Sequence, residues 1–449
     1  MKKRPPTPPT SWSRREFIEL SAAATGFSLA AHPFRFRQVA PSDTVRFGMV
    51  GIGMQGNGLL GTSIQLPGVT CAGAADLYDG RHTLAKEIAG ANLPTTREYR
   101  KLLDDKNIDC IVAAVPDHWH KRMVVEAVGA GKDIYIEKPM SHTPADGVAM
   151  VEAVKKSGKI LQVGSQRVSS LICAKAKEMV AQGMLGDLTL VEGWLGRNDP
   201  TGAWEYPPPP DLSLKTLDWD TWQNDVPKRP LDANIFARWR CWKEYGTGVA
   251  GDLLVHLISG MQFMLGMNEP PKQAMSVGGI RRWKDGRNMP DVHATVYYYS
   301  GDLPVYMRLN LGTEMPEQYR IQGSQGVLEV AGNKLTFTPQ SGKDQWPSYY
   351  TGSYPRALRD AYQAQWHKEH DPTPGQAPAL EESVTFTTPD FDDTRPHLWN
   401  FFEAVRTRKP VVEDVVFGHN AALACHMANE AYFRRTAVTW DEGTKTMKA

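Results

Sequence analysis

Three side chains in this 449-residue sequence have the types and surroundings that acid–base chemistry on an alcohol requires. His256 lies in an apolar stretch, Asp252 precedes it by four residues, and Lys138 is the middle residue of Glu137-Lys138-Pro139. Oxidation of a secondary hydroxyl needs a base for the hydroxyl proton, and imidazole has a suitable pKa. A lysine ammonium can donate to the reacting oxygen and stabilise its developing charge. Asp252, one helical turn before His256, would share its face and either hold a neighbouring hydroxyl or orient the imidazole.

Each of these residues also has a purely structural interpretation. Lys138 is alternatively a surface lysine, Asp252 a helix cap, and His256 a core histidine among Leu, Val and Ile neighbours. The run Asp117-His118-Trp119-His120 contains the residue types of metal ligands, but no further ligand cluster supports it. The sequence therefore predicts catalytic roles for Lys138, Asp252 and His256, and no metal site.

A glycine-rich hexapeptide predicts a dinucleotide site. It stands between an apolar run at 45–50 and a helix expected over 57–65, and it matches G-x-G-x-x-G with Gly51, Ile52, Gly53, Met54, Gln55 and Gly56. Only glycine allows so tight a turn, and a pyrophosphate would lie at the helix N-terminus. Asp76 ends the next apolar run, 20 residues after Gly56, where a carboxylate binds both ribose hydroxyls and repels a 2′-phosphate. We expect NAD rather than NADP, a preference that Arg81 weakens; the alternative is an ordinary glycine-rich turn.

The elements that would position these residues alternate between strand and helix up to Gly164. Strands are expected at 45–50, 69–75, 109–115, 132–136 and 160–164, and further helices at 99–105, 121–129 and 145–157. This order predicts a doubly wound parallel sheet that binds ligands at the carboxyl ends of its strands. Asp76, residues 117–120 and residues 137–139 all follow such strands. We therefore expect these three polar clusters in one crevice.

Beyond Gly164 the strand pattern changes. Longer alternating runs at 188–195, 293–299, 305–311 and 327–330 suit a largely antiparallel sheet with one covered face. Two terminal helices are expected at 395–407 and 419–433, and residues 340–388, rich in Pro, Ser and Gln, indicate an extended surface arm. The predicted fold class is α/β: a Rossmann domain with a doubly wound parallel sheet, then an α/β domain with a mostly antiparallel sheet.

Together, Gly51–Gly56, Asp76, Glu137-Lys138-Pro139 and Gly246–His256 resemble the Gfo/Idh/MocA family, over about residues 44–441. The resemblance implies an NAD-binding Rossmann domain at 44–165, a substrate and oligomerisation domain with a large open sheet at 166–441, and a homo-oligomer, dimer or tetramer. It assigns catalysis to Lys138, Asp252 and His256. It also implies cofactor contacts by further residues, namely Pro116, His118, Trp119, His120, Glu137, Lys138 and Gln166. Trp119 and His120 would lie near the nicotinamide, and Gln166 and Arg167 near the substrate. Many members carry a second acid where this chain has Ser259.

Aromatic and basic residues are concentrated in one later segment. Six of the 13 tryptophans fall between residues 194 and 242, namely Trp194, Trp204, Trp219, Trp222, Trp239 and Trp242. Flat rings stack on sugar faces, so these residues either line a carbohydrate cleft or pack the two domains together. Cations lie among them and could reach hydroxyls or a carboxylate. The candidate substrate residues are Arg167, Arg238, Trp239, Arg240 and Lys243.

The net charge of +1 averages over two unlike parts of the chain. Residues 1–40 hold seven Lys or Arg and two Glu, which leaves the rest near −4, so nothing favours a nucleic-acid partner. The sequence at 13–18, Ser-Arg-Arg-Glu-Phe-Ile, and the weakly apolar run at 20–31 resemble a twin-arginine export signal. Residues 28–30 are one possible cleavage site, and the run is too short to span a membrane. Alternatively, this is a disordered tail with two adjacent arginines. Five scattered cysteines without a C-x-x-C pair favour neither disulfides nor zinc.

These patterns predict an exported, periplasmic enzyme with a small carbohydrate substrate. Free NAD is scarce outside the cytoplasm, so a chain that folds before export would carry its cofactor out and regenerate it in place. The first hypothesis is an oxidoreductase that oxidises one sugar, polyol or glycoside and reduces another on the same NAD. The alternative is an NAD-dependent glycosidase or lyase that oxidises the sugar ring transiently and eliminates the aglycone. A third role, ligand sensing, is disfavoured because Lys138 and His256 are both present.

Overall fold

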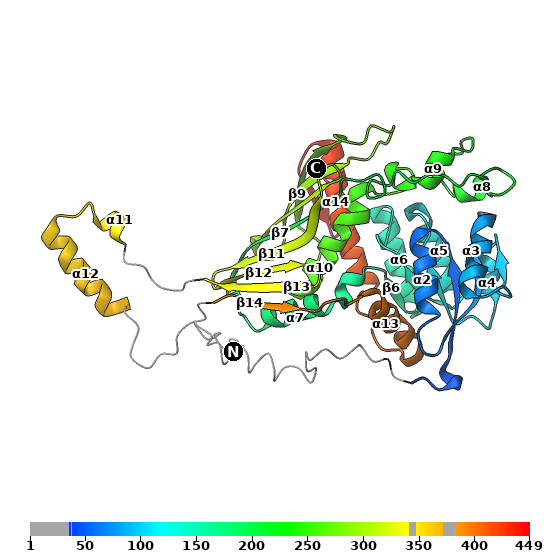
Figure 1. Ribbon diagram of the computed structural model, residues 1–449. Coiled ribbons are helices and arrows are strands. Elements are labelled where there is room, and N and C mark those ends of the chain that lie inside the picture. Colours follow the sequence, from blue (N-terminus) through cyan, green and yellow to red (C-terminus); the bar gives the residue numbers. More distant parts are fainter. Residues whose placement is uncertain (1–35, 37, 341–346, 371–381) are drawn as a thin grey trace.

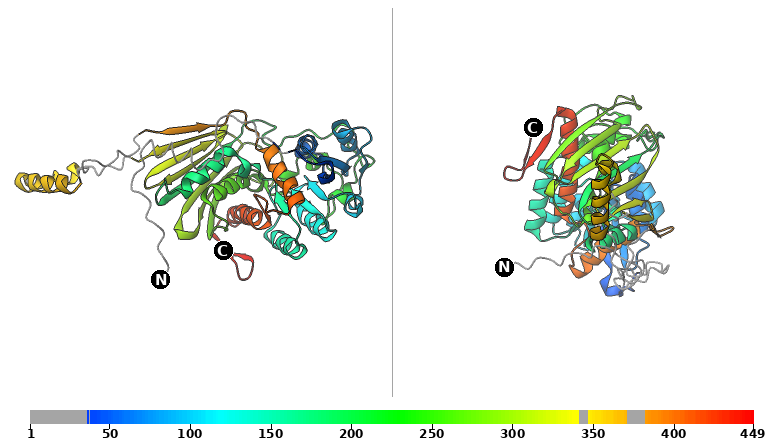
Figure 2. Two further views of the ribbon diagram at one scale, coloured as in Figure 1. Left: turned by 90° about the horizontal axis from the view of Figure 1, so that it is seen from below. Right: turned by 90° about the vertical axis from the view of Figure 1, so that its left-hand side faces the viewer.

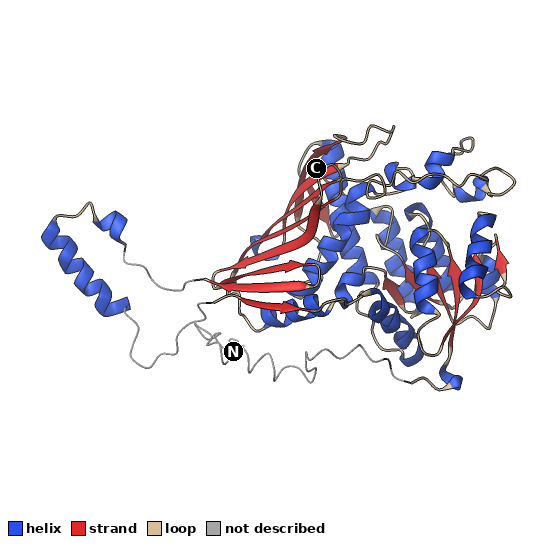
Figure 3. Ribbon diagram, in the orientation of Figure 1, coloured by secondary structure: helices blue, strands red, loops and turns tan. Residues whose placement is uncertain are grey.

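The computed structural model describes residues 36, 38–340, 347–370 and 382–449. The predicted twin-arginine leader therefore lies almost wholly outside the described residues. Two β-sheets are arranged side by side, with helices packed on and between them (Figure 1, Figure 3). Within the described ranges, no helix has the length and apolar character needed to cross a membrane.

The N-terminal sheet has six parallel strands in the order β3-β2-β1-β4-β5-β6, which confirms the predicted doubly wound arrangement. Its strands are β1 (Val45–Val50), β2 (Val69–Ala75), β3 (Thr95–Thr96), β4 (Cys110–Ala113), β5 (Asp133–Ile136) and β6 (Leu161–Val163). The connecting helices are α2 (Met54–Ser63), α3 (Asp79–Ala89), α4 (Arg100–Asp104), α5 (His120–Gly129) and α6 (Pro144–Ser157). Every residue of β4 and β5 is buried, as expected of central parallel strands covered on both faces.

The second sheet has ten strands and is mostly antiparallel, as predicted. Its order is β14-β13-β12-β11-β7-β10-β9-β8-β15-β16, and the pair β7–β10 is parallel. The strands are β7 (Leu188–Gly196), β8 (Gln273–Gly279), β9 (Val292–Tyr298), β10 (Pro304–Asn310), β11 (Met315–Gly323), β12 (Gly326–Ala331), β13 (Lys334–Pro339), β14 (Val384–Thr387), β15 (Val438–Asp441) and β16 (Thr446–Lys448). Buried and half-buried residues alternate along β9, β10 and β12, so one face of the sheet forms the core.

Helices α7 (Leu171–Ala181), α10 (Val255–Leu265) and α14 (Val415–Arg434) cover that face and share one hydrophobic core with it. Helix α13 (Thr394–Thr407) is different, because it packs on the N-terminal sheet although it lies near the C-terminal end of the chain. Its Leu398, Phe401 and Phe402 join the core of that sheet, with the Phe402 ring 5.6 Å from that of Phe47. The Rossmann core is thus built from both ends of the described chain.

The predicted extended arm at 340–388 is wrong in part, because it contains helices. Helices α11 (Ser348–Thr351) and α12 (Arg356–His370) project away from the body of the molecule (Figure 2). The 15 residues of α12 contain no Gly or Pro, and Leu358, Tyr362 and Trp366 recur at a four-residue spacing. The Pro, Ser and Gln residues that suggested an extended chain lie largely outside this helix, so the average composition of the segment concealed it.

Residues 205–245, which we call the strap, cross from the second domain onto the carboxyl edge of the N-terminal sheet. The strap contains α8 (Trp219–Trp222) and α9 (Ala233–Ala237). The Asp79 N–H donates to the Thr216 carbonyl at 2.9 Å, and the Asp218 N–H donates to the Leu77 carbonyl at 3.1 Å. These backbone bonds attach the strap to the start of α3.

The clustered tryptophans mainly pack the domains together. Trp204, Trp219 and Trp222 are buried, and Trp219 and Trp222 stack on each other with ring centroids 4.8 Å apart. Trp219 and Trp222 form a small apolar cluster with Tyr78 of the Rossmann domain and other strap residues. The predicted alternative, domain packing, therefore holds for Trp219 and Trp222, whereas Trp204 belongs to the core of the second domain.

Candidate active site

The glycine loop has the geometry of a phosphate-binding turn. Gly51 has a φ of +81°, and a Cβ added there would lie 2.4 Å from the Ala114 carbonyl oxygen. A Cβ at Gly56 would lie 1.9 Å from the Gly51 carbonyl oxygen, so both positions require glycine. Helix α2 begins at Met54 and its N-cap, Gly53, supplies no side-chain cap. The N–H groups at this helix start are thus available to an anion, which fits a pyrophosphate.

Asp76 closes the loop at the end of β2. Its Oδ2 accepts the Ile52 N–H at 2.8 Å, and its Oδ1 accepts the Tyr78 N–H at 3.0 Å. Arg81 reaches the same carboxylate at 3.4 Å. These contacts hold Asp76 beside the loop, where the predicted ribose contact requires it.

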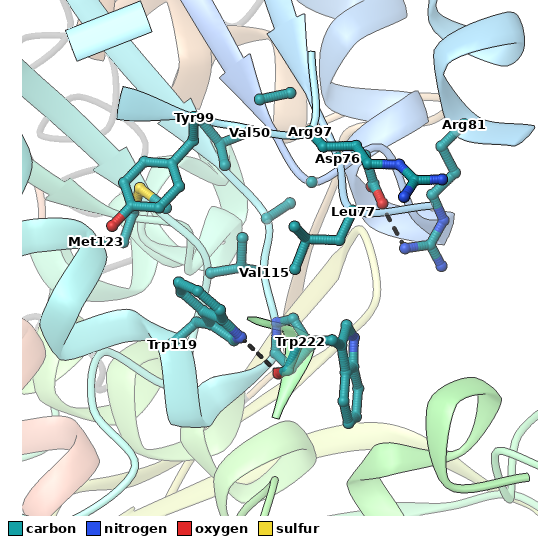
Figure 4. Close-up of a pocket in the computed structure, with 14 residues that line it drawn as sticks. Val50, Asp76, Leu77, Arg81, Arg97, Tyr99, Val115, Trp119, Met123 and Trp222 are labelled. Atoms are coloured by element: carbon teal, nitrogen blue, oxygen red, sulfur yellow. Dashed lines mark hydrogen bonds and ion pairs between the residues drawn. The ribbon is translucent and has the colours of Figure 1, made fainter. Parts of the chain in front are cut away.

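A pocket opens beside Asp76 (Figure 4). Its other lining residues come from the ends of β1, β2 and β4 and from the strap, and they include Gly51, Pro116, Trp119 and Trp222. The mostly apolar lining beside a carboxylate suits a nucleoside. Trp119 lies in the same pocket wall as Asp76, and the expectation that it lies near the nicotinamide stays a prediction.

The expectation that His118 and His120 contact the cofactor is not supported. His120 is fully buried, and its ring nitrogens contact the carbonyls of Pro139 at 2.8 Å and Val115 at 2.9 Å. It therefore fixes the Lys138-Pro139 turn instead of facing an open pocket. His118 contacts two carbonyls of the strap, and burial lowers its pKa to about 3. Both histidines position neighbouring segments.

Lys138 and Asp252 form the centre of the predicted catalytic group. The Lys138 Nζ donates to the Asp252 Oδ1 and to the Asp252 carbonyl, each at 2.9 Å, and the Arg240 Nε donates to the same Oδ1 at 2.9 Å. Burial disfavours a charge on Asp252, but the charges of Lys138 and Arg240 lower its pKa far below the usual range. The side chain of Lys138 is only 12% exposed, which excludes the surface-lysine alternative.

A wide helical turn brings these residues together. Asp252 lies within the π-helical turn Ala250–Leu254, which continues directly into α10, so it is not the cap of that helix. A Cβ at Gly251 would lie 1.7 Å from the Thr247 Oγ1 and 3.0 Å from the Pro139 Cγ. Glycine at this position therefore lets the Lys138-Pro139 turn approach the helix.

His256 follows in the first turn of α10 and is half-buried. In the part of the chain that the structure describes, its ring makes no hydrogen bond, while its carbonyl accepts the Tyr319 hydroxyl at 2.9 Å. Burial first, and then the positive charges of Lys138, Arg167 and Arg197, lower the pKa of His256 well below 6.5. It is a neutral, unpaired base instead of a satisfied core histidine. The idea that Asp252 orients the imidazole is wrong, because Asp252 binds Lys138 and Arg240.

Glu137 connects the cofactor loop to the catalytic group. Its Oε1 accepts from the Gln55 Nε2 at 3.1 Å and from the Gln166 Nε2 at 3.2 Å. Gln166 also donates to the Tyr135 hydroxyl at 3.2 Å. The predicted cofactor residues Gln55, Glu137 and Gln166 thus lie together, next to Lys138.

The predicted substrate residues separate into two groups. Arg240 binds Asp252, and Arg167 lies near His256 while paired with Glu317 at 2.8 Å and Asp393 at 3.4 Å. Arg238 is held by Glu205 in the strap, and the Lys243 ammonium lies 5.7 Å from the ring centroid of Phe433. Trp239 lies beneath the Arg240 guanidinium at 4.2 Å. Arg238 and Lys243 thus already have partners, Glu205 and Phe433, and their predicted substrate contacts stay predictions.

Sequence reasoning missed two residues of this region. Arg197 follows β7, and its position at a strand end before Asn198-Asp199-Pro200 was the available signal. Glu413 is fully buried and accepts from Ser165 at 3.1 Å and from Ser259 at 3.3 Å, which no sequence pattern indicated. Burial raises the pKa of Glu413 well above its usual range, so Ser259 binds a neutral acid from a distant segment.

No group of three metal-ligating side chains occurs within the described ranges. In the run considered as a metal site, the Asp117 carboxylate accepts the Thr247 N–H at 3.0 Å and the Thr247 hydroxyl at 2.6 Å. The ring nitrogens of His118 and His120 contact backbone carbonyl oxygens. These residues therefore connect the domains.

Comparisons with known proteins agree with this architecture. Residues 45–165 match the family model described as an oxidoreductase family, NAD-binding Rossmann fold, and residues 177–438 match the model of its C-terminal alpha/beta domain. An inositol 2-dehydrogenase of Salmonella paratyphi B is 28% identical over 33% of this chain, a segment that spans 45% of that relative. A glycosyl hydrolase family 109 protein of Bacteroides fragilis is 24% identical over 74% of this chain and 72% of its own length.

Solved structures show the same fold. The structure of a levoglucosan dehydrogenase in complex with NADH and levoglucosan superposes with a TM-score of 0.64 and 16% identity, and the match covers 88% of this chain and 99% of that one. The glycine loop and the Lys138-Pro139 turn both lie within the first matched range, residues 45–165. The two matched domains follow each other in this order and cover most of the described chain. The chain belongs to the Gfo/Idh/MocA family of oxidoreductases.

Proposed function

We propose that this chain is an exported NAD-dependent oxidoreductase that acts on a secondary hydroxyl of a sugar, polyol or glycoside and keeps its NAD bound between turnovers. The observation that carries this proposal is that Lys138, ion-paired with the ionised Asp252, lies near His256, whose neutral ring makes no hydrogen bond within the described residues. A proton acceptor and a hydrogen-bond donor for one oxygen are what alcohol oxidation requires.

Each residue of the site has a separate role in the proposed reaction. Gly51–Gly56 and Asp76 would hold the phosphates and a ribose of NAD, which when bound supplies a hydride acceptor. His256 accepts the proton of the substrate hydroxyl at a ring nitrogen. Lys138 donates to the same oxygen and stabilises its developing negative charge. Asp252 holds the Lys138 ammonium in place through two 2.9 Å contacts, so Asp252 is a positioning residue.

Retention of the cofactor is supported by the strap. The Trp119 indole N–H donates to the Trp222 carbonyl at 2.9 Å, and a His118 ring nitrogen contacts the same oxygen at 2.9 Å. Trp222 also lines the nucleoside pocket, so these contacts hold the strap against the place proposed for the cofactor (Figure 4). A retained NAD must be regenerated in place by a second substrate, which agrees with the export that the twin-arginine pattern at 13–18 indicates.

The alternative is a redox-neutral glycosidase or lyase. It is favoured by the glycosyl hydrolase family 109 relative, whose match extends over 74% of this chain. In that reaction oxidation of a ring hydroxyl to a ketone would acidify the neighbouring C–H bond, a base would remove that proton, and the aglycone would depart as its protonated alcohol and leave an enone. In the glycosidase, water then adds to the enone before the ketone is reduced again, whereas a lyase releases the unsaturated sugar. His256 and Lys138 would serve both reactions.

The decisive experiment is to purify the exported protein and to detect bound NAD by absorbance and mass spectrometry. A panel of sugars, polyols, keto-sugars and aryl glycosides is then added. Net NADH formation, or reduction of a second sugar, supports the oxidoreductase. Aglycone release without net NADH supports the glycosidase. Absence of bound NAD contradicts the proposed retention.

A further inference from the structure

Arg197 is a cation of the site that the proposed reaction leaves unused. Residues 191, 193 and 195 of β7 point into the core beneath the helices, and a side chain two residues further lies on the same face of the strand. The Arg197 N–H donates to the Asn310 carbonyl at 2.9 Å, which extends the strand register to this residue. The Arg197 side chain therefore emerges on the face that carries His256.

Two neighbours confirm where the guanidinium lies. Burial has the largest influence on the pKa of His256 and of Tyr206, and the Arg197 charge lowers both pKa values. A Cβ at Gly202 would lie 2.7 Å from the Asp199 Oδ2, 2.9 Å from the Arg197 Cβ and 3.0 Å from the Arg197 Cδ, so the Asp199 carboxylate is near the stem of Arg197 but forms no ion pair with its guanidinium. The absence of a side chain at Gly202 thus leaves the space through which the stem of Arg197 passes.

The charges around His256 do not cancel. Lys138 and Arg240 share one carboxylate, and Arg167 lies between two others. Among the described residues, by contrast, no carboxylate is within ion-pair distance of Arg197. Arg197 is thus the cation of this group whose half-buried guanidinium has no ion-pair partner among the described residues, and its donors are available to a ligand.

We propose that Arg197 binds a carboxylate on the substrate, so that the preferred substrates are acidic sugars such as uronic or aldonic acids. This inference rests on the proposed function and narrows its substrate class. The planar guanidinium fork matches the two oxygens of a carboxylate. A single guanidinium carries one positive charge, which matches a monoanionic carboxylate better than a phosphate dianion.

The test compares acids with their uncharged amides on the full chain with NAD bound. D-Glucuronate is paired with D-glucuronamide, and D-gluconate with D-gluconamide. We expect the wild type to prefer the acids, and Arg197→Gln to lower the acid-to-amide ratio of kcat/KM by about 30-fold or more, as expected when one partner of a shielded charge pair is removed. Arg197→Lys keeps the charge without the fork and should recover part of the ratio.

Arg308→Gln is the matched control, because Arg308 lies over Trp194 on the opposite face of the same sheet. It should leave the ratio at the wild-type value. An unchanged ratio in Arg197→Gln, or a wild type that prefers the amides or glucose 6-phosphate, overturns the inference and leaves the proposed oxidoreductase intact.

If no sugar is oxidised, the proposed function fails, and calorimetry then decides the inference separately. Binding of D-glucuronate to the NAD-loaded wild type that is lost in Arg197→Gln supports the carboxylate site. Equal binding by both proteins, or none by either, overturns it.

Discussion

The cofactor half and the substrate half of the crevice consist of different kinds of chemical group. The cofactor half consists of backbone N–H groups and glycines within Gly51–Asp76, completed by one carboxylate. The substrate half consists of side-chain charges that come from β5, the end of β7, the strap and the π-helical turn. A backbone site is specified by a short contiguous motif, whereas a site of paired charges is specified by which residues the fold brings together.

The largest expected effect separates chemistry from cofactor binding. His256→Asn and Lys138→Met should each lower kcat/KM by about 10²- to 10⁴-fold, because each removes a group that acts on the substrate oxygen. Bound NAD, measured by mass spectrometry of the purified protein, should be retained. Lys101→Met, an exposed lysine of α4, is the control and should have wild-type activity. Loss of NAD from the His256 variant would show that the two halves are not independent.

The reverse experiment acts on the cofactor half. Gly56→Ala places a Cβ 1.9 Å from the Gly51 carbonyl oxygen and forces the loop to move. We expect NAD affinity to fall by about 10- to 100-fold, corresponding to a backbone strain of 1–3 kcal/mol. Gly58→Ala lies in the same helix with open space around it and should bind NAD as the wild type does. Equal affinities of the two variants would contradict the phosphate-binding role of the loop.

The strap joins the two halves. Removing one of its side chains, that of Trp222, should have a smaller effect on NAD binding than Gly56→Ala has. Trp222→Ala deletes a ring that lines the nucleoside pocket and stacks on Trp219. The dissociation rate of NAD should rise by about 3- to 10-fold, the usual range for one aromatic pair. Stopped-flow displacement of NADH measures this rate. Leu214→Ala changes an exposed residue of the same segment and should leave the rate unaltered.

The smallest effect is a shift in pH dependence. Because the pKa of His256 is lowered, the neutral base persists below pH 6.5, and kcat/KM should decline only at more acidic pH. Removing a neighbouring cation raises this pKa, so Arg197→Gln should move the acid limb of the profile to higher pH. The profiles are measured with an uncharged substrate. A decline centred at the ordinary histidine value in the wild type would contradict the site electrostatics.

The difference between the halves also explains what the sequence could predict. The bounds of β1 and β2 agree with the prediction, because buried parallel strands read as continuous apolar runs. The glycine loop and Asp76 are likewise local signals. The pairing of Arg167 with Glu317 and Asp393 joins residues at least 150 positions apart, which no spacing rule reveals.

The contacts of the candidate basic residues could not be predicted from the sequence. Arg238 and Lys243 have partners, Glu205 and Phe433, that no spacing in the sequence indicated. Arg197 carried only the weak signal of a strand end. The burial of His120 could not be predicted from the sequence either, because a polar residue that follows a parallel strand normally faces the crevice.

The position of α13 sets the order in which the molecule can be completed during synthesis. The Rossmann core needs Leu398, Phe401 and Phe402, which leave the ribosome after all of the strap and the ten-stranded sheet up to β14. At about 5–20 residues per second, the dinucleotide domain waits tens of seconds for its last helix. By then the strap is already present, so the cofactor crevice and its cover mature as one unit when the chain is nearly finished. A ribosome-bound chain that stops before Thr394 should therefore lack a finished cofactor domain, although every residue of the glycine loop has been made.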